Sequence, residues 1–215
     1  MKRKWLFYVT FFTLLILGFY YGLTRALPGF GKVKLPVLAY VRPFSFINQD
    51  GERITEKEVD GKVYVAEYFF TTCHGICPIL NRNMKTVYEE FKTEPRFLIL
   101  SHTCDPANDN IARLKHYSDS LGVNNERWWF LTGDKEDLYQ AARVSYLLDD
   151  PKNNAANIDE QFLHTQFFAL VDKAGQVRKI YDGLKKDEIS ELKREIRELL
   201  EESPGKQFRS DNVIN

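Results

Sequence analysis

The chain has 215 residues with 30 basic and 30 acidic side chains, so its formal net charge is zero. Without a basic stripe, this balance argues against nucleic acid as a partner. About 160 residues beyond the amino-terminal region are enough for one ordinary domain with a real core.

The first residues combine a basic start with an apolar run. Met1-Lys2-Arg3-Lys4 is followed by Trp5 to Leu23 without one charged residue. At 1.5 Å per residue, about nineteen residues span roughly the 30 Å hydrocarbon core of a bilayer. A cleaved signal peptide is the alternative, but its apolar region is normally shorter and no A-x-A-like site follows. The sequence therefore predicts a transmembrane anchor over 1–27.

Basic residues before a span favour a cytoplasmic amino terminus, although Arg25, Lys32 and Lys34 on the far side weaken the asymmetry. No presequence precedes the span, which favours a bacterial inner membrane over a mitochondrial one. We therefore expect a single-pass inner-membrane protein whose domain lies in the periplasm. In that oxidising compartment a thiol pair must be kept reduced or must be functional.

The stretch 28–43 is rich in Gly, Pro and Lys without a sustained period, so it is interpreted as a tether. A domain over 44–203 and a polar tail over 204–215 complete the chain. Within the domain, periodicity and turn residues predict a hairpin of 44–47 and 53–55, strands over 63–70, 96–101, 128–131, 166–171 and 177–181, and helices over 78–91, 111–121, 135–144 and 186–202. Strands separated by helices predict a mostly parallel sheet with helices on both faces, and the late hairpin adds antiparallel strands. This α/β order is that of a thioredoxin-like fold with an N-terminal hairpin and a single N-terminal transmembrane helix.

Cys73 and Cys77 lie one helical turn apart, where a buried strand is expected to run into a helix. Two thiols at this spacing can hold a soft metal or form and break a disulfide. Pro78 suits a first helical position, which would put Cys77 at the helix cap beside free backbone N–H groups. The positive end of the helix dipole is then expected to favour the thiolate of Cys77 over the thiol.

Three less reactive interpretations apply to the pair: small buried hydrophobes, a static disulfide, or half of a structural zinc site. Zinc is the weakest, because the sequence has no second Cys or His pair at short spacing. A C-x-x-C-H haem attachment is excluded, since His74 follows the first cysteine and Pro78 follows the second. Reactive or metal-binding cysteines are favoured, and the spacing alone does not choose between copper and disulfide exchange.

Several patches give the sequence a family resemblance. They are Phe69-Phe70-Thr71-Thr72-Cys73 through Cys77-Pro78, Ser101 through Asp105-Pro106, Trp129-Phe130-Leu131-Thr132-Gly133, and His164-Thr165 with Phe167 through Asp172 and Gly175. With these patches the chain resembles the Sco/SenC family of membrane-tethered copper proteins that help assemble cytochrome c oxidase. The resemblance extends from about Pro43 to Leu200 and is much more specific than the cysteine spacing alone.

In this family the two motif cysteines and a histidine of the late loop bind one copper ion. The resemblance therefore implies Cys73, Cys77 and His164 as the metal ligands. Thiolates hold Cu(I), and an added imidazole gives a donor set that also accommodates Cu(II). The implied function is a non-enzymatic, membrane-anchored copper chaperone that delivers copper, or reduces thiols, for the dinuclear copper site of cytochrome c oxidase subunit II or another copper-site client. A thiol reductant protein is the second implied partner.

The chain departs from the family at two positions. His74 stands where members often have Pro, and it can point into solvent, stabilise a thiolate or act as an extra ligand. Cys104 stands where an aliphatic residue is expected, and it can be a buried small hydrophobe, a metal ligand or a partner in a mixed disulfide. Asp105 is a candidate beside the copper loop or an ordinary turn residue. Glu67, inside an apolar strand, should be paired or proton-shuttling.

Two other functions compete with a copper carrier. A periplasmic thiol-disulfide oxidoreductase is the main alternative, but such enzymes use C-x-x-C, and no Pro precedes the strand at Phe167 where they place a cis-Pro. A thiol peroxidase with Cys73 as nucleophile would leave His164 unexplained. His102, at a strand end, and His116, on a helix surface, receive only a structural interpretation.

Overall fold

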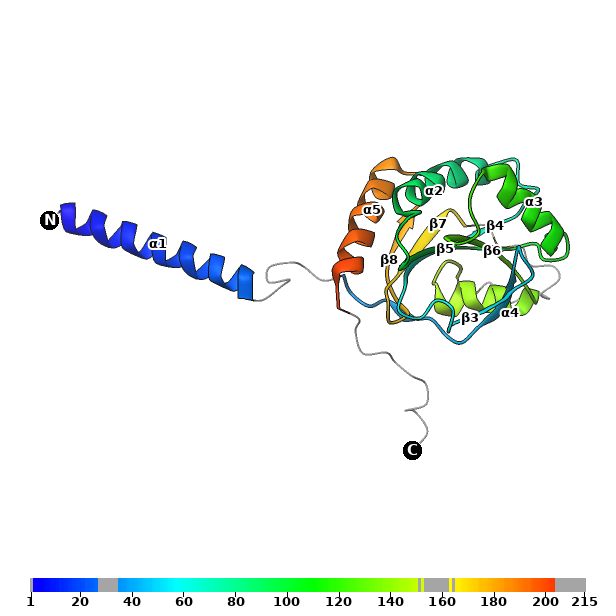
Figure 1. Ribbon diagram of the computed structural model, residues 1–215, viewed down its shortest axis with the longest axis horizontal. Helices are drawn as coiled ribbons and strands as arrows, with labels where there is room; N and C mark the ends of the chain where they lie inside the picture. The colour runs from blue at the N-terminus through cyan, green and yellow to red at the C-terminus, as the bar shows by residue number, and fades with distance from the viewer. Residues whose placement is uncertain (1, 27–34, 151, 153–162, 164, 204–215) are drawn as a thin grey trace, which may run out of the picture. The chain divides into compact units, whose positions relative to one another are not determined.

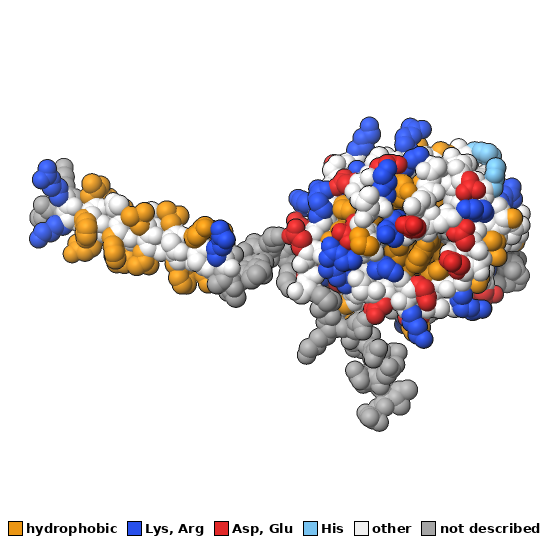
Figure 2. Space-filling model, viewed as in Figure 1, with side chains coloured by type: hydrophobic (Ala, Val, Ile, Leu, Met, Phe, Trp, Pro, Cys, Tyr) orange, Lys and Arg blue, Asp and Glu red, His pale blue; other side chains and the backbone are white. Residues whose placement is uncertain are grey.

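The computed structural model describes residues 2–26, 35–150, 152, 163 and 165–203, and the chain divides into two compact units, Met1–Leu35 and Pro36–Asn215. The first unit contains α1 (Lys2–Ala26), and within it Arg3–Leu23 is long and apolar enough to cross a membrane. The mean hydropathy of Arg3–Leu23 is 1.8, and none of this segment is buried. Apolar side chains cover the helix in Figure 2. By length and composition, α1 is a candidate membrane span.

The second unit is built on one sheet of eight strands in the order β1-β8-β7-β4-β5-β6-β2-β3. The strands are β1 (Ala39–Tyr40), β2 (Ser45–Asn48), β3 (Arg53–Thr55), β4 (Val63–Phe69), β5 (Phe97–Thr103), β6 (Trp128–Thr132), β7 (Phe167–Val171) and β8 (Gln176–Asp182). The central strands β4 and β5 are buried along their whole length, which explains their continuous apolar character.

The expectation of a mostly parallel sheet is wrong. Among the strands that the structure describes, only the pairs β4 with β5 and β5 with β6 are parallel, whereas the other five pairs are antiparallel. The reason lies in the connections, because β2–β3 and β7–β8 are hairpins, and each hairpin joins the three parallel strands in the antiparallel sense. The expected N-terminal hairpin is present, and Gly51 turns it with a φ of 80°.

Helices cover both faces of the sheet (Figure 1). On one face lie α2 (Cys77–Phe91), α3 (Ile111–Leu121) and α5 (Lys186–Glu201). On the other face lies α4 (Lys135–Gln140), which continues into a π-helical segment, η1 (Ala141–Ser145). The sequence predicts these two as one regular helix over 135–144. The hydrophobic core beneath α4 and η1 contains Cys104 together with Tyr64, Tyr68, Tyr139 and Tyr146.

Strand β1 is the element that the sequence does not predict, and it falls inside the stretch 28–43 interpreted as a tether. Its two residues pair with Val177 and Gln176 of β8, and flanking backbone bonds extend the pairing on both sides. Backbone hydrogen bonds to an existing edge hold this short segment, so no hydrophobic period is needed to specify it.

Candidate functional site

The two motif cysteines lie at the carboxyl edge of the central strands. Cys73 follows β4 after a tight turn in which its backbone N–H donates to the Phe70 carbonyl at 3.2 Å. Cys77 is the first residue of α2, with Ile76 as the N-cap and Pro78 one position later than expected. Cys77 is buried, whereas Cys73 is partly exposed. One thiol is therefore fixed by a helix, and the other lies on an accessible loop.

The structure brings the two thiols together in the reduced state. Both are free cysteines, and their side chains are within hydrogen-bonding reach of each other. Burial, followed by the hydrogen bond and charge of Cys73, raises the pKa of Cys77 from 9.0 to about 12. The expectation that the helix dipole favours the Cys77 thiolate is therefore wrong for the metal-free protein, because desolvation outweighs the dipole. A metal cation would be needed to displace the proton from the Cys77 thiol.

Glu67 lies in the buried part of β4 on the same face as α2 and is 1% exposed. Ser101 on the neighbouring strand donates its hydroxyl to Glu67 Oε1 at 2.5 Å, and the Trp128 indole N–H donates to Ser101 Oγ at 2.8 Å. Burial raises the pKa of Glu67 to about 7 even though the Ser101 bond opposes this. The expected pairing is thus supplied by a hydroxyl group and not by a cation.

Tyr117 of α3 lies within electrostatic range of this carboxyl group and of both thiols. Its ring stacks on Phe69 with centroids 5.3 Å apart, and its hydroxyl accepts a 2.5 Å hydrogen bond from the Asn81 side chain. Burial and then the nearby charges of Glu67, Cys77 and Cys73 raise its pKa. The hydrogen bond between Asn81 and Tyr117 joins α2 to α3.

Cys104 lies at the end of β5 and is 2% exposed. Its thiol donates to the Phe69 carbonyl at 3.0 Å, and its backbone N–H donates to the same oxygen at 2.9 Å. Burial raises its pKa, and the charge of Cys77 adds to this effect. A buried thiol with a backbone partner fits the interpretation of a small core residue beside the site.

His164 lies outside the described residues, but its neighbours on both sides are placed. The Leu163 N–H donates to the Tyr139 hydroxyl at 3.1 Å, and that hydroxyl donates to the Cys104 carbonyl at 2.9 Å. On the other side, β7 begins at Phe167 and runs antiparallel to β4, so its start lies at the edge where β4 ends. The chain on either side of His164 is therefore held at the edge that carries the cysteines.

The other histidines singled out by the sequence have no contact with the thiols among the described residues. His74 and His116 are exposed. His102 is fully buried on the opposite face of the sheet, where it stacks on Tyr68 with ring centroids 5.0 Å apart, and burial lowers its pKa to about 4. Asp105 accepts hydrogen bonds from the backbone and side chain of Asn108, which is ordinary turn chemistry.

A residue that the sequence does not mark is hydrogen-bonded to the loop that carries Cys73. Asp109 is 0% exposed, and its carboxyl oxygens accept hydrogen bonds from the N–H and hydroxyl of Thr71 and from the hydroxyl of Thr103. An Asp just before a helix is common capping chemistry, so its position carries no distinctive signal. Its partner Thr71 lies 38 positions earlier, and only the fold reveals that contact.

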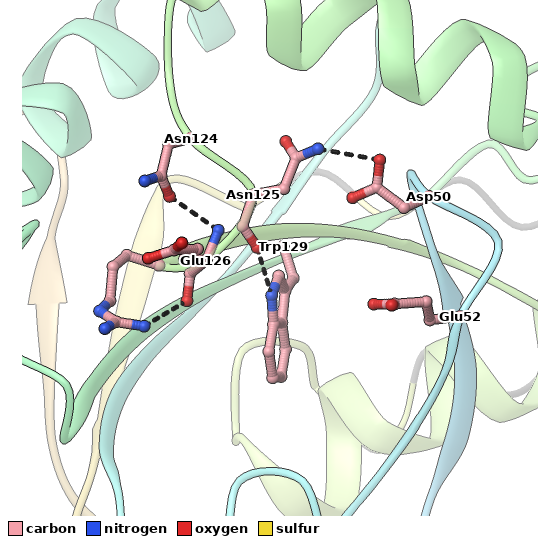
Figure 3. A pocket seen from close by; sticks show the side chains of 7 residues that line it. Asp50, Glu52, Asn124, Asn125, Glu126 and Trp129 are labelled. Atoms are coloured by element: carbon pink, nitrogen blue, oxygen red, sulfur yellow. Dashed lines mark hydrogen bonds between the residues drawn. The ribbon is translucent and has the colours of Figure 1, made fainter.

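Basic and acidic side chains are interspersed over the face of the folded unit that Figure 2 shows. An open hollow of about 610 Å³ lies between the β2–β3 turn and the start of β6, lined by Asp50, Glu52, Asn124, Asn125, Glu126, Arg127 and Trp129 (Figure 3). Within the described residues, which exclude His164, no three His, Cys, Asp or Glu side chains gather as a metal site.

Comparison with known proteins gives this geometry a family. A family model described as SCO1/SenC matches residues 34–201. The chain belongs to the SCO1/SenC family. It is 31% identical over 170 residues to the SCO1 protein homolog of Bacillus subtilis (strain 168), which covers 75% of this chain and 86% of that protein.

Solved structures of SCO1/SenC proteins share the fold. BsSco, a member of the Sco family of cytochrome c oxidase assembly proteins with a disulfide switch, is 26% identical with a TM-score of 0.67 over 80% of this chain and all of its own. Yeast Sco1 with copper bound is 24% identical with a TM-score of 0.56 over 79% of this chain and 98% of its own, a likeness of fold alone. The expected thioredoxin-like α/β class is confirmed.

Proposed function

We propose that this chain is a membrane-anchored copper carrier that binds one copper ion through Cys73, Cys77 and His164. The observation that carries the proposal is the pair of free thiols, held together at the sheet edge to which the chain on both sides of His164 is tied. Copper is also the metal in the yeast Sco1 structure. Two thiolates and an imidazole form a donor set that suits both Cu(I) and Cu(II).

The residues present fit copper better than zinc or a permanent disulfide. The partly exposed thiol of Cys73 is accessible to a metal ion or a client protein, whereas a structural zinc site is closed by four ligands. The buried Cys77 has a raised pKa, so copper must displace its proton when it binds. Acid therefore favours release of the cargo, because protons compete for the same sulfur.

The proposed client is the dinuclear copper site of cytochrome c oxidase subunit II or another copper-site protein. BsSco, a relative with the same fold, belongs to a family of cytochrome c oxidase assembly proteins. The carrier would pass copper, or it would reduce a disulfide of the client to two thiols while Cys73 and Cys77 are oxidised to a disulfide. A thiol reductant protein would then return Cys73 and Cys77 to the dithiol. The α1 helix would anchor it in an inner membrane with the amino terminus in the cytoplasm and the folded unit in the periplasm.

The test is metal analysis of the full chain in detergent after titration with Cu(I) and Cu(II). The reduced protein should bind one copper per chain, and oxidation of Cys73 and Cys77 to a disulfide should abolish binding because the thiolate ligands are consumed. Stoichiometric copper on the fully oxidised protein would contradict the ligand set. A reduced protein that binds no copper but exchanges disulfides rapidly would instead support the thiol-disulfide oxidoreductase.

A further inference from the structure

The loop that carries Cys73 is attached to the fold through Asp109. Thr71, two residues before Cys73, donates its backbone N–H to Asp109 Oδ2 at 3.2 Å and its hydroxyl to Oδ1. These bonds fix the first central residue of the turn in which the Cys73 N–H reaches back to the Phe70 carbonyl. Cys77, by contrast, is positioned by α2 itself.

Asp109 is in turn held from the other side. The Thr103 hydroxyl at the end of β5 donates to Asp109 Oδ2 at 2.5 Å, and the Asp105 N–H donates to Thr103 Oγ1 at 2.9 Å. The Asp109 N–H donates to the Asp105 carbonyl at 2.9 Å. A fully buried carboxyl group with three donors has little freedom to move, since each broken bond would leave a desolvated polar group.

We infer that Asp109 is a positioning residue that, through Thr71, holds Cys73 opposite Cys77 for copper capture. The inference rests on the proposed function, and it explains why a ligand on an exposed loop can act together with a ligand on a rigid helix. Ligands carried by loops are placed less accurately than ligands on helices unless a surrounding set of hydrogen bonds locks them. The hydrogen bonds between Thr71 and Asp109, called the clamp below, hold the loop in this way.

The experiment measures the rate at which a Cu(I) chelator, bathocuproine disulfonate, removes copper from the full chain in detergent. Thr71→Val keeps the shape of the side chain but removes the hydroxyl, whereas Thr71→Ser keeps the hydroxyl. We expect copper release to be about tenfold faster in Thr71→Val, the equivalent of one hydrogen bond to a charged group, and unchanged in Thr71→Ser. Asp109→Asn should match Thr71→Val, because its amide has one acceptor oxygen for three donors.

Asp172→Asn is the matched control for a general loss of stability. Asp172 is also a buried carboxyl group with three donors, from Ala174, Gln176 and Arg178, but it lies in the β7–β8 turn at the opposite end of the sheet. Its substitution should lower the melting temperature and leave copper release within about twofold of the parent. Equal acceleration by Asp172→Asn and Asp109→Asn would overturn the positioning role.

Hydrogen exchange at the Cys73 amide tests the clamp without metal. Exchange should be about tenfold faster in Thr71→Val and Asp109→Asn than in the parent or Thr71→Ser. Unchanged exchange, or faster exchange with unchanged copper release, would overturn the inference. If the parent bound no copper while exchange still accelerated, the proposed function would fail and the clamp would stand.

Discussion

Replacing Glu67 by Gln is expected to stabilise the folded unit above pH 7 and to change little near pH 4.5. Burial raises the pKa of Glu67 from 4.5 to about 7, so between these values the folded state holds a proton that the unfolded state has lost. The contribution of Glu67 to stability therefore falls as pH rises through this window and levels off above it. The full loss corresponds to about 3 kcal/mol, at about 1.4 kcal/mol for each pH unit.

The measurement is urea unfolding of the reduced, metal-free unit Pro36–Asn215 between pH 5 and 8. Fluorescence of Trp128 reports on this region, because its indole donates to Ser101, the partner of Glu67. The Gln side chain can still accept from Ser101, but it carries no proton to lose. The difference in unfolding free energy between variant and parent should grow with pH to about 3 kcal/mol.

Neighbouring groups do not produce the same slope. Burial raises the pKa of Cys77 from 9.0 to about 12, which lies above the window. Burial lowers the pKa of His102 from 6.5 to about 4, so its contribution to stability rises with pH, and it cancels in the difference because it is the same in both proteins. Glu89→Gln, at an exposed position paired with Lys92, is the matched control and should give a difference that is flat with pH. An equally flat difference for Glu67→Gln would refute the reasoning.

Three further substitutions test separate parts of the account. Cys104→Ala should keep one copper per chain and lower the unfolding free energy by about 1 kcal/mol, since a thiol hydrogen bond is lost; loss of half or more of the copper would place Cys104 in the site. Gly183→Ala should lower the free energy of unfolding by about 1–3 kcal/mol, because an added Cβ would lie 2.6 Å from Phe168 Cζ and 2.7 Å from Leu80 Cδ2. An unchanged thermal midpoint of unfolding would contradict this prediction. His164→Ala should retain Cu(I) but lower the affinity for Cu(II) about tenfold or more, because the harder ion loses its nitrogen donor. The affinity for Cu(II) is measured by titration, from the visible absorption of thiolate-to-Cu(II) charge transfer. Equal affinities of mutant and parent for both ions would end the ligand assignment.

The elements that position the cysteines are predictable because local patterns determine them. A continuous apolar run gives β4, and an amphipathic period with Pro78 near its start gives α2. The cysteines therefore fall at a strand-to-helix junction in both the prediction and the structure. Sheet direction is not local, since it depends on which edge each hairpin joins. Both expected hairpins are present, but the expectation of a mostly parallel sheet is wrong because β2 joins β6 and β7 joins β4 in the antiparallel sense.

The contacts that the sequence does not reveal join residues that are far apart along the chain. Asp109 reaches Thr71 across 38 positions, and Leu163 reaches Tyr139 across 24. The state of the Cys77 thiol also depends on the fold, because helix position predicts a low pKa whereas burial, visible only in three dimensions, raises it. The assignment of His164 as a metal ligand comes from the family resemblance, and it stays a prediction because His164 lies outside the described residues.

The most direct test of the proposed site is X-ray absorption spectroscopy of the copper-loaded full chain in detergent, beside its His164→Ala variant. We expect two sulfur scatterers from Cys73 and Cys77 and one nitrogen scatterer in the Cu(II) form, with the nitrogen contribution lost in the variant. A first shell of nitrogen and oxygen alone, or one that is the same in both proteins, would contradict it.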